Sequence, residues 1–330
     1  MLIRFFKSNQ PAALFAVPVL VSALWISSFF HTNIPTISGA MPLYQLLLYL
    51  LELINGNIPT VHLLIGIALT SFQAIYLGQI CNKFDVLYKK SYLPALLYAI
   101  LISSVPSFLS MTPMLVANTI LLLLIEKIFS IYKHESALHV VFDAGFLVAL
   151  ASLVYFPLIA IFVLLILGLL ILRPFVWREW VAGITGTALP YFILSVYFFW
   201  NGQLGNFWTK EIPLYFDHAI TSHISTNTSN LFLFSMVAFL ILIAFLKLQA
   251  NFYKNMIRTR SYQQVFLLML IVAGGSSVIS PEIKIESFIP AVAPAAVFIS
   301  YYFLSVKKTW WIETLFSILI ALIVWNQVTS

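Results

Sequence analysis

The stretch from Leu231 to Leu246, LFLFSMVAFLILIAFL, is a run of apolar residues broken only by Ser235. Such a run is typical of a helix that crosses a lipid bilayer, because the helix satisfies its own backbone hydrogen bonds and hydrocarbon accepts its side chains. Similar runs recur throughout the 330 residues, of which 62% are hydrophobic and 8% are charged. Soluble domains carry roughly 25% charged residues. The sequence therefore predicts an all-α integral membrane protein.

A hydrocarbon core of about 30 Å needs roughly twenty helical residues to cross. By this criterion we expect a polytopic transmembrane helix bundle of about 11 spans, which forms a single transmembrane domain, residues 1–330. The turns at residues 110–112 and 156–157 leave two interpretations open, since each could separate two full spans or lie within a re-entrant hairpin. The predicted spans are Pro11–Phe30, Ile58–Ile80, Tyr92–Leu109, Pro113–Ile131, Ala137–Tyr155, Pro157–Leu172, Trp180–Trp200, Leu231–Leu246, Val265–Ser280, Phe288–Leu304 and Trp310–Gln327.

The lysines and arginines predict the orientation of these spans. If the N-terminus is cytoplasmic, 15 of the 17 Lys and Arg residues fall in inner loops, and only Lys210 and Lys284 fall outside. This asymmetry is the one described by the positive-inside rule. We therefore expect a multi-pass protein of the inner (cytoplasmic) membrane, with the N-terminus inside and the C-terminus outside. Because topology accounts for the net charge of +6, we expect no nucleic-acid partner.

Two predicted outer segments are candidates for a ligand site. Pro42–Asn55 lies in the first outer loop and is too short to span, so its helical leucine spacing predicts an interfacial amphipathic helix. Asn201–Asn230 is the longest polar stretch of the chain. We expect an external ligand to meet these two segments together. The residues of the predicted apolar face of the first segment are Leu43, Leu46, Leu47, Leu50, Leu51 and Ile54.

Few residues of these outer regions could carry chemistry. Glu52 and His31 are the candidate catalytic residues: either could activate the acceptor, Glu52 as a general base and His31 by moving a proton or binding a phosphate. His218 and His223 permit metal binding by their spacing, but a solvated loop is the favoured interpretation, and we expect neither a metal nor a cofactor. The chain has no GxxxxGK[ST], GxGxxG, HExxH or CxxC motif. The residues expected to bind a substrate are His62, Trp208, Lys210, Asp217, His218 and His223.

Asp143 is the acidic residue predicted to lie deepest in a span, about two turns from the cytoplasmic side. One interpretation makes it a proton or ion site. The other, which we favour, pairs it with an inner lysine or arginine, because a buried carboxylate is costly unless it is paired.

Three further patterns have structural interpretations. The segment Gly183-Ile-Thr-Gly186 predicts a close approach of two helices. Glu179 is interpreted as an inner-surface partner of its neighbour Arg178. The alternating charges of residues 282–286, which end in Glu286, are interpreted as a solvent-exposed edge.

The segment Asp143-Ala-Gly-Phe-Leu-Val-Ala-Leu-Ala-Ser-Leu-Val-Tyr-Phe-Pro157, with Arg173-Pro-Phe, Arg178-Glu-Trp and Gly186 to Pro190 after it, resembles the middle of GT-C membrane glycosyltransferases. More closely, the whole chain resembles a family of uncharacterised bacterial polytopic membrane proteins. The GT-C resemblance implies an enzyme that takes a sugar from a lipid-phosphate carrier, with an acidic base in the first outer loop. Here His31, Thr32 and Asn33 follow the first span, so the base role passes to Glu52.

The expected function is thus to bind or transfer a lipid-linked sugar at the outer face, with membrane lipids and a polyprenyl-phosphate-linked sugar as partners. The carrier phosphate would meet His218, His223 or Lys210. Two alternatives stay open: a non-catalytic subunit with protein partners in a cell-envelope complex, and a transporter or flippase that uses Asp143.

The orientation gives a direct prediction. A tag fused after Ser330 should be reached by a membrane-impermeant reagent from outside intact cells, because an odd number of spans separates the two termini. Labelling that requires permeabilised cells would contradict the predicted positions of all outer loops.

Overall fold

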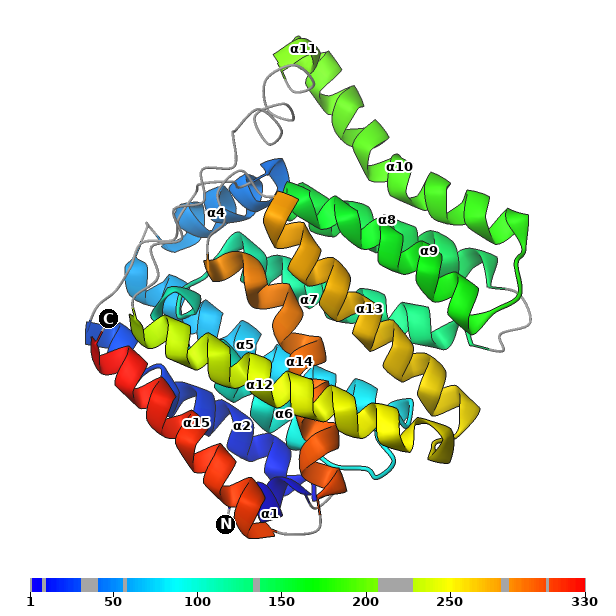
Figure 1. Cartoon of the computed structure of the whole chain (residues 1–330). Helices are drawn as coiled ribbons and strands as arrows, with labels where there is room; N and C mark the ends of the chain where they lie inside the picture. The colour runs from blue at the N-terminus through cyan, green and yellow to red at the C-terminus, as the bar shows by residue number, and fades with distance from the viewer. Residues whose placement is uncertain are drawn as a thin grey trace.

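The computed structural model describes residues 2–7, 10–30, 41–55, 58–132, 137–206, 228–279, 285–306 and 309–329. All regular elements in these ranges are helices, which confirms the predicted all-α class (Figure 1). The helices are α1 (Leu2–Lys7), α2 (Ala12–Leu24), α3 (Ile26–Phe30), α4 (Pro42–Asn55), α5 (Pro59–Lys83), α6 (Leu93–Ile102), η1 (Pro106–Phe108), α7 (Pro113–Ser130), α8 (Leu138–Val154), η2 (Phe156–Ala160), α9 (Ile161–Leu172), α10 (Trp177–Trp200), α11 (Leu204–Asn206), α12 (Thr228–Asn251), η5 (Phe252–Lys254), α13 (Ile257–Ile279), η6 (Ile285–Phe288), α14 (Ile289–Ser305) and α15 (Thr309–Thr329).

Within the described residues, six helical segments are long and apolar enough to cross a membrane. The chain is therefore a membrane-spanning helical protein. The other predicted spans coincide with shorter or less apolar helices, so the full number of eleven stays a prediction. The six segments are Pro59–Lys83, Pro113–Ser130, Trp177–Trp200, Thr228–Lys254, Ile285–Ser305 and Trp310–Gln327.

Helix α6 differs most from its predicted span, Tyr92–Leu109, because it ends at Ile102. Val105 is extended and precedes Pro106, and the residue before a proline is disfavoured in helical geometry. The ten residues of α6 rise about 15 Å, roughly half of a bilayer core. An irregular segment, residues 103–112, follows α6 and leads into α7.

The helix ends gather at two ends of the bundle, which we name the Lys83 end and the His62 end after the two ends of α5 (Figure 1). At the Lys83 end, Thr259 Oγ1 donates a hydrogen bond to Asp85 O (3.0 Å), which joins α13 to the segment after α5. The described lysines and arginines lie in α1, near the ends of α5, α7, α9 and α12, in the segment between α5 and α6, and near the starts of α10 and α13, and these parts of the helices form the Lys83 end (Figure 1). These residues are Arg4, Lys7, Lys83, Lys89, Lys90, Lys127, Arg173, Arg178, Lys247, Lys254, Arg258 and Arg260.

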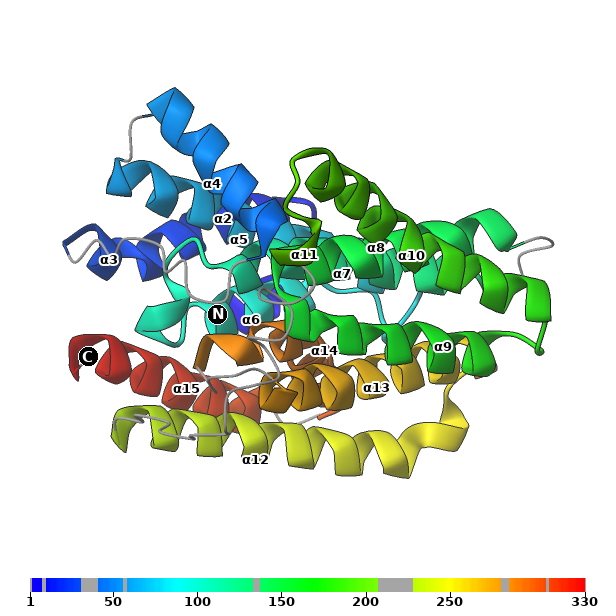
Figure 2. The ribbon, with the colours of Figure 1, turned by 90° about the horizontal axis from the view of Figure 1, so that it is seen from above.

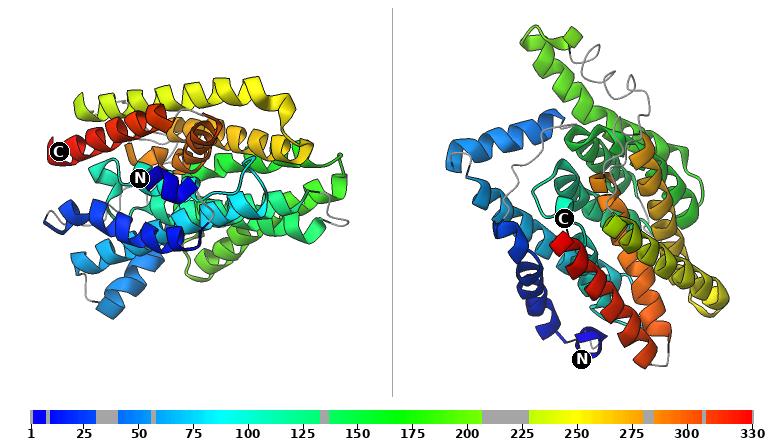
Figure 3. Two further views of the ribbon diagram at one scale, coloured as in Figure 1. Left: turned by 90° about the horizontal axis from the view of Figure 1, so that it is seen from below. Right: turned by 60° about the vertical axis from the view of Figure 1, so that its left-hand side comes forward.

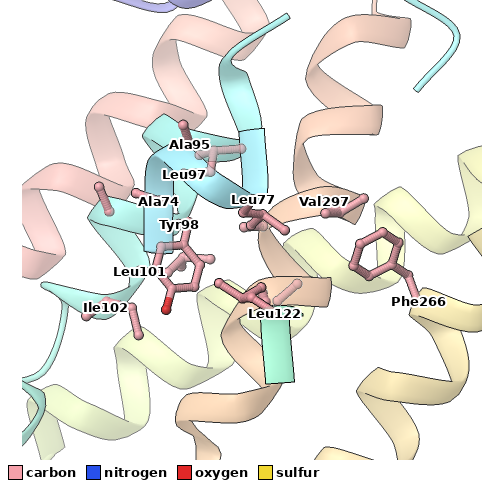
Figure 4. Close-up of a cluster of buried hydrophobic side chains, with 14 of the residues drawn as sticks. Ala74, Leu77, Ala95, Leu97, Tyr98, Leu101, Ile102, Leu122, Phe266 and Val297 are labelled. Atoms are coloured by element: carbon pink, nitrogen blue, oxygen red, sulfur yellow. The ribbon is translucent and has the colours of Figure 1, made fainter. Parts of the chain in front are cut away.

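The core of the bundle forms around α14, since 89% of the span Ile285–Ser305 is buried inside the protein. Val297 of α14, Leu77 of α5 and Leu122 of α7 point toward one another, with Phe266 of α13 alongside (Figure 4). The peripheral helices are very different. Only 17% of the α10 span and 22% of the α12 span are buried, and these two helices lie on opposite sides of the bundle (Figures 2 and 3).

Helix α10 is attached to α8 through glycines. A Cβ atom placed on Gly186 would lie 2.2 Å from Phe142 O, and one on Gly145 would lie 2.3 Å from Gly183 O. No side chain fits at these distances, so the two backbones are in direct contact. The close helix approach predicted from Gly183-Ile-Thr-Gly186 is therefore confirmed. Because most of α10 is otherwise exposed, this contact is its principal attachment.

We predict that Gly186→Ala lowers the stability of the protein by about 1–3 kcal/mol, because the added methyl group forces α8 and α10 apart. Alanine is otherwise the better helix former by up to about 1 kcal/mol. The matched control is Gly274→Ala in α13, where no atom lies within 4 Å of the new Cβ, so stability should hold or rise. Thermal unfolding in detergent measures both changes, and equal melting temperatures would contradict the close contact.

Candidate functional site

The segment of residues 103–112, which we call the 103–112 loop, is the main interruption of helical backbone inside the bundle. Most of the loop is buried, although only three of its residues, the short helix η1, are regular. Inside a membrane protein such backbone is tolerated only where other groups satisfy its carbonyl and amide groups. The hydrogen-bond partners of the 103–112 loop therefore show which helices are joined at the His62 end.

The last turns of α15 supply two of these partners. Gln327 Nε2 donates to Ser103 O (2.7 Å), and Asn326 Nδ2 donates to Ser104 O (3.0 Å). The amide of Asn326 also binds a second element that is distant in sequence. Its Nδ2 atom donates to Asn230 Oδ1 (2.9 Å) at the start of α12. The C-terminal helix thus holds the loop against α12.

The predicted first span, Pro11–Phe30, is broken next to the same loop. Helix α2 ends before Trp25, whose buried indole Nε1 donates to Ser103 Oγ (3.1 Å). A Cβ on Gly66 of α5 would lie 2.9 Å from the Trp25 ring, so the absence of a side chain there makes room for the indole. The position of Trp25 therefore depends on both α5 and the loop.

A small pocket lies on the other side of the loop, at the start of α5. His62 is 4% exposed, and no described residue forms a hydrogen bond with its Nδ1 atom. The cavity holds about 10 Å³, room for roughly one water molecule. Its wall is made of Ser28, Pro59, His62, Leu63, Leu109, Ser110 and Met111.

The lining of this pocket determines what it can bind. An imidazole and the hydroxyl groups of Ser28 and Ser110 can each donate or accept a hydrogen bond. No lysine, arginine or carboxylate contributes to the wall among the described residues. This chemistry suits an uncharged hydroxyl group better than a phosphate, which needs cationic partners.

Helix α4 covers this region, and it is helical over the whole predicted range Pro42–Asn55. Tyr44 Oη donates to Met111 O (2.6 Å), and Met41 N donates to Val154 O (3.3 Å) at the end of α8. The face that packs on the protein contains the buried Tyr44 and Leu48, with Leu43, Leu47 and Leu51 of the predicted apolar face packed beside them. Exposed apolar residues cover the other side of α4: Leu46, Tyr49, Leu50, Leu53 and Ile54.

Glu52 is exposed near the C-terminal end of α4, and among the described residues it forms no hydrogen bond or ion pair. Tyr44, eight residues earlier, points into the protein, so Glu52 lies about 12 Å further along the helix axis. Glu52 lies in the last turn of α4, and His62 lies in the first turns of α5, the next helix along the chain. The other predicted site residues lie outside the described residues: His31, Trp208, Lys210, Asp217, His218 and His223.

Asp143 lies near the Lys83 end, where Lys127 Nζ donates to its Oδ2 atom at 2.7 Å. Both side chains are nearly half exposed. This is the paired arrangement that we favoured for Asp143 from the sequence. On the preceding residue of α7, Glu126 accepts from Lys83 Nζ (2.6 Å) and from the Tyr76 hydroxyl.

Glu179 has a different partner from the predicted one. Arg173 Nη2 lies 3.2 Å from Glu179 Oε1, and both side chains are largely buried. Arg178 instead lies over the ring of Trp177, 5.8 Å from its centre. The inner-surface pair with Arg178 is therefore wrong, because the turn between α9 and α10 points Glu179 back toward Arg173.

Sequence reasoning missed two polar features. Inside the bundle, Gln73 Nε2 donates to Thr119 Oγ1 (2.6 Å), Tyr98 Oη donates to Gln73 Oε1, and Asn118 Nδ2 donates to Tyr98 Oη. This network joins α5, α6 and α7, and the amides of Gln73 and Asn118 inside two apolar spans were its signal. The second feature is Glu286, which is half-buried and not fully exposed, in the short helix η6 (Ile285–Phe288) that contacts η1.

Comparison with known proteins gives one match. The model of a family of unknown function (DUF6427) matches residues 27–329. No curated protein and no solved structure matches the chain.

We predict that Gln327→Leu destabilises the protein by about 1–3 kcal/mol, because it leaves the buried Ser103 carbonyl without its donor. The same change at the exposed amide of Gln203 is the matched control and should shift stability by less than about 0.5 kcal/mol. Thermal unfolding in detergent compares the two variants. Equal melting temperatures would show that α15 does not hold the 103–112 loop.

Proposed function

The chain belongs to the DUF6427 family of unknown function, and we propose that it binds the hydroxyl-bearing head group of a lipid, such as a lipid-linked sugar, at the outer face of the inner membrane. In this proposal about eleven spans cross the membrane and the His62 end faces outside. The N-terminus is then cytoplasmic.

The distribution of positive charge supports this orientation. All the described lysines and arginines lie at the Lys83 end, and the positive-inside rule places such an end in the cytoplasm. The hydrogen bonds of the 103–112 loop gather the opposite ends of the helices at the His62 end. The pocket would then open toward the outer leaflet.

The observation that carries the proposal is the buried Nδ1 atom of His62, with which no described residue forms a hydrogen bond. A buried polar atom without a partner costs about 1–3 kcal/mol, so a ligand or water that binds it is favoured. The pocket is uncharged, and Tyr44 of α4, whose outward side is apolar, donates to the carbonyl group of the wall residue Met111. An amphiphile supplies both matching parts: a hydroxyl for the pocket and a hydrocarbon tail for the surface of α4.

Transfer of the sugar is the less supported part of the proposal. The GT-C resemblance assigns the base role to Glu52, but this residue is exposed and lies about 12 Å along α4 from Tyr44, the residue that bonds the pocket wall. The Asp143–Lys127 ion pair gives the transporter alternative no support. Binding without transfer also agrees with a non-catalytic role in an envelope complex.

We predict that the purified protein in nanodiscs binds polyprenyl-phosphate-linked glucose more tightly than polyprenyl phosphate without the sugar. His62→Ala should weaken binding of the sugar lipid about three- to tenfold, which is the effect of one lost hydrogen bond. Native mass spectrometry measures the bound fraction. The matched control is His139→Ala at the Lys83 end, which should bind as the wild type does.

Equal binding of the two lipids by the wild-type protein would contradict recognition of the sugar. A weakened His139→Ala variant would instead indicate a general effect of histidine loss. Thermal unfolding of each variant separates a loss of binding from a loss of structure.

A further inference from the structure

The end of α12, η5 and the start of α13 form a basic hairpin at the Lys83 end, which we call the 247–260 hairpin after its residues (Figure 1). It contains no acidic residue. Within the described part of the chain, its only ion pair joins Arg258 Nη2 to Asp85 Oδ2, which lie 3.9 Å apart. The hairpin thus carries an excess of positive charge. Its four cations are Lys247, Lys254, Arg258 and Arg260.

Hydrogen bonds hold the hairpin against the segment that follows α5. Thr259 Oγ1 donates to Asp85 O (3.0 Å), and Gln263 Nε2 donates to Val86 O (2.9 Å). Within the hairpin, Asn255 Nδ2 donates to Gln263 Oε1 (3.2 Å). The backbone that carries the cations is therefore fixed before any ligand binds, which lowers the entropic cost of binding.

Large apolar side chains lie among these cations at the tip of the hairpin. Tyr253 is 88% exposed, Met256 is 80% exposed and Ile257 is 69% exposed. Contact of such side chains with water is unfavourable, and burial among lipid chains removes that cost. Exposed apolar residues beside lysines and arginines are the combination that binds a membrane surface, and tyrosine is enriched at that depth.

Arg260 indicates most directly which chemical group the hairpin binds. Its side chain is partly buried, and its guanidinium group lies over the Phe252 ring, 5.5 Å from the centre. No described residue accepts a hydrogen bond from its buried Nε atom or forms an ion pair with it. A partly buried charge is costly without an opposite charge. The planar guanidinium group matches the oxygens of a phosphate, to which it can donate two parallel hydrogen bonds.

We propose that the 247–260 hairpin binds the phosphate head groups of anionic phospholipids, with Tyr253, Met256 and Ile257 inserted beside the lipid chains. This site lies at the opposite end of the bundle from the His62 pocket and does not depend on the proposed function. Helix α12 is peripheral, since only 22% of its span is buried, so the hairpin emerges where the bundle meets lipid. That position and the apolar tip favour a lipid over a soluble acidic protein.

The test uses the full-length protein in detergent, with phosphatidylglycerol and phosphatidylcholine of the same acyl chains as probes. Native mass spectrometry measures the bound fraction of each lipid. We expect the wild type to bind phosphatidylglycerol more tightly. Arg260→Gln and Lys254→Gln should each weaken that binding about fivefold, which is the contribution of one basic residue near an anionic lipid surface. The matched control, Arg4→Gln in α1, removes the same charge elsewhere at the Lys83 end and should stay within twofold of the wild type.

Two results of this experiment would overturn the inference. Either both hairpin variants bind phosphatidylglycerol as the wild type does, or Arg4→Gln weakens binding as much as they do. The second result would show an effect of net charge without a specific site. Lys254 is exposed, so Lys254→Gln tests the hairpin even if thermal unfolding shows that Arg260→Gln is unstable.

The position of the apolar tip is tested separately with a spin label on Met256→Cys. Cys81, the single cysteine of the chain, is replaced by alanine. In nanodiscs that contain phosphatidylglycerol, we expect oxygen, which partitions into lipid, to relax the label more strongly than a water-soluble nickel complex does. Stronger relaxation by the nickel complex would place the tip in water. That outcome would contradict the insertion and favour a soluble acidic partner.

Discussion

The structure depends on one constraint: where water is excluded, each backbone carbonyl and amide group needs a partner within the protein. The ten residues of α6 cover only about half of a bilayer core, and the 103–112 loop continues without regular helix. Side chains from α15 and α4 then satisfy the carbonyl groups of the loop. The first and last parts of the chain are thus joined through a segment from its first third.

The same constraint explains why the candidate site lies where it does. The backbone amide and carbonyl groups of a regular helix bind one another, so few are free to bind a ligand. A polar recognition site therefore forms most easily where helices end. The break at Trp25, the start of α5, the 103–112 loop and η6 all lie at the His62 end. The Lys83 end, in contrast, is rich in charge, and its acidic residues Asp143 and Glu126 are paired with lysines.

The sequence was most informative where a residue type directly determines structure. Apolar runs located the helices, and Gly183 and Gly186 predicted the close contact with α8, because the absence of a side chain is itself the cause of that contact. It was less informative about tertiary partners. The apolar run through Tyr92–Leu109 continues beyond Ile102, so hydropathy did not reveal the end of α6 at the proline.

The site was predicted only in part for the same reason. His62 was selected from its position near the end of a span, but its burial and unpaired nitrogen depend on a loop that lies more than forty residues further along the chain. Leucine spacing predicted the helix Pro42–Asn55, but it gave no sign that Tyr44 turns inward and donates to Met111 O.

The burial of α14 has a consequence for how the protein is made. This helix is the centre of the bundle, yet nearly nine-tenths of the chain precedes its first residue during synthesis. The helices that surround it must therefore enter the membrane before the surface they pack on exists. Biogenesis then needs a late assembly step in which loosely associated helices pack around α14 after it enters the membrane. A ribosome that stalls before this point leaves a chain that lacks its central helix.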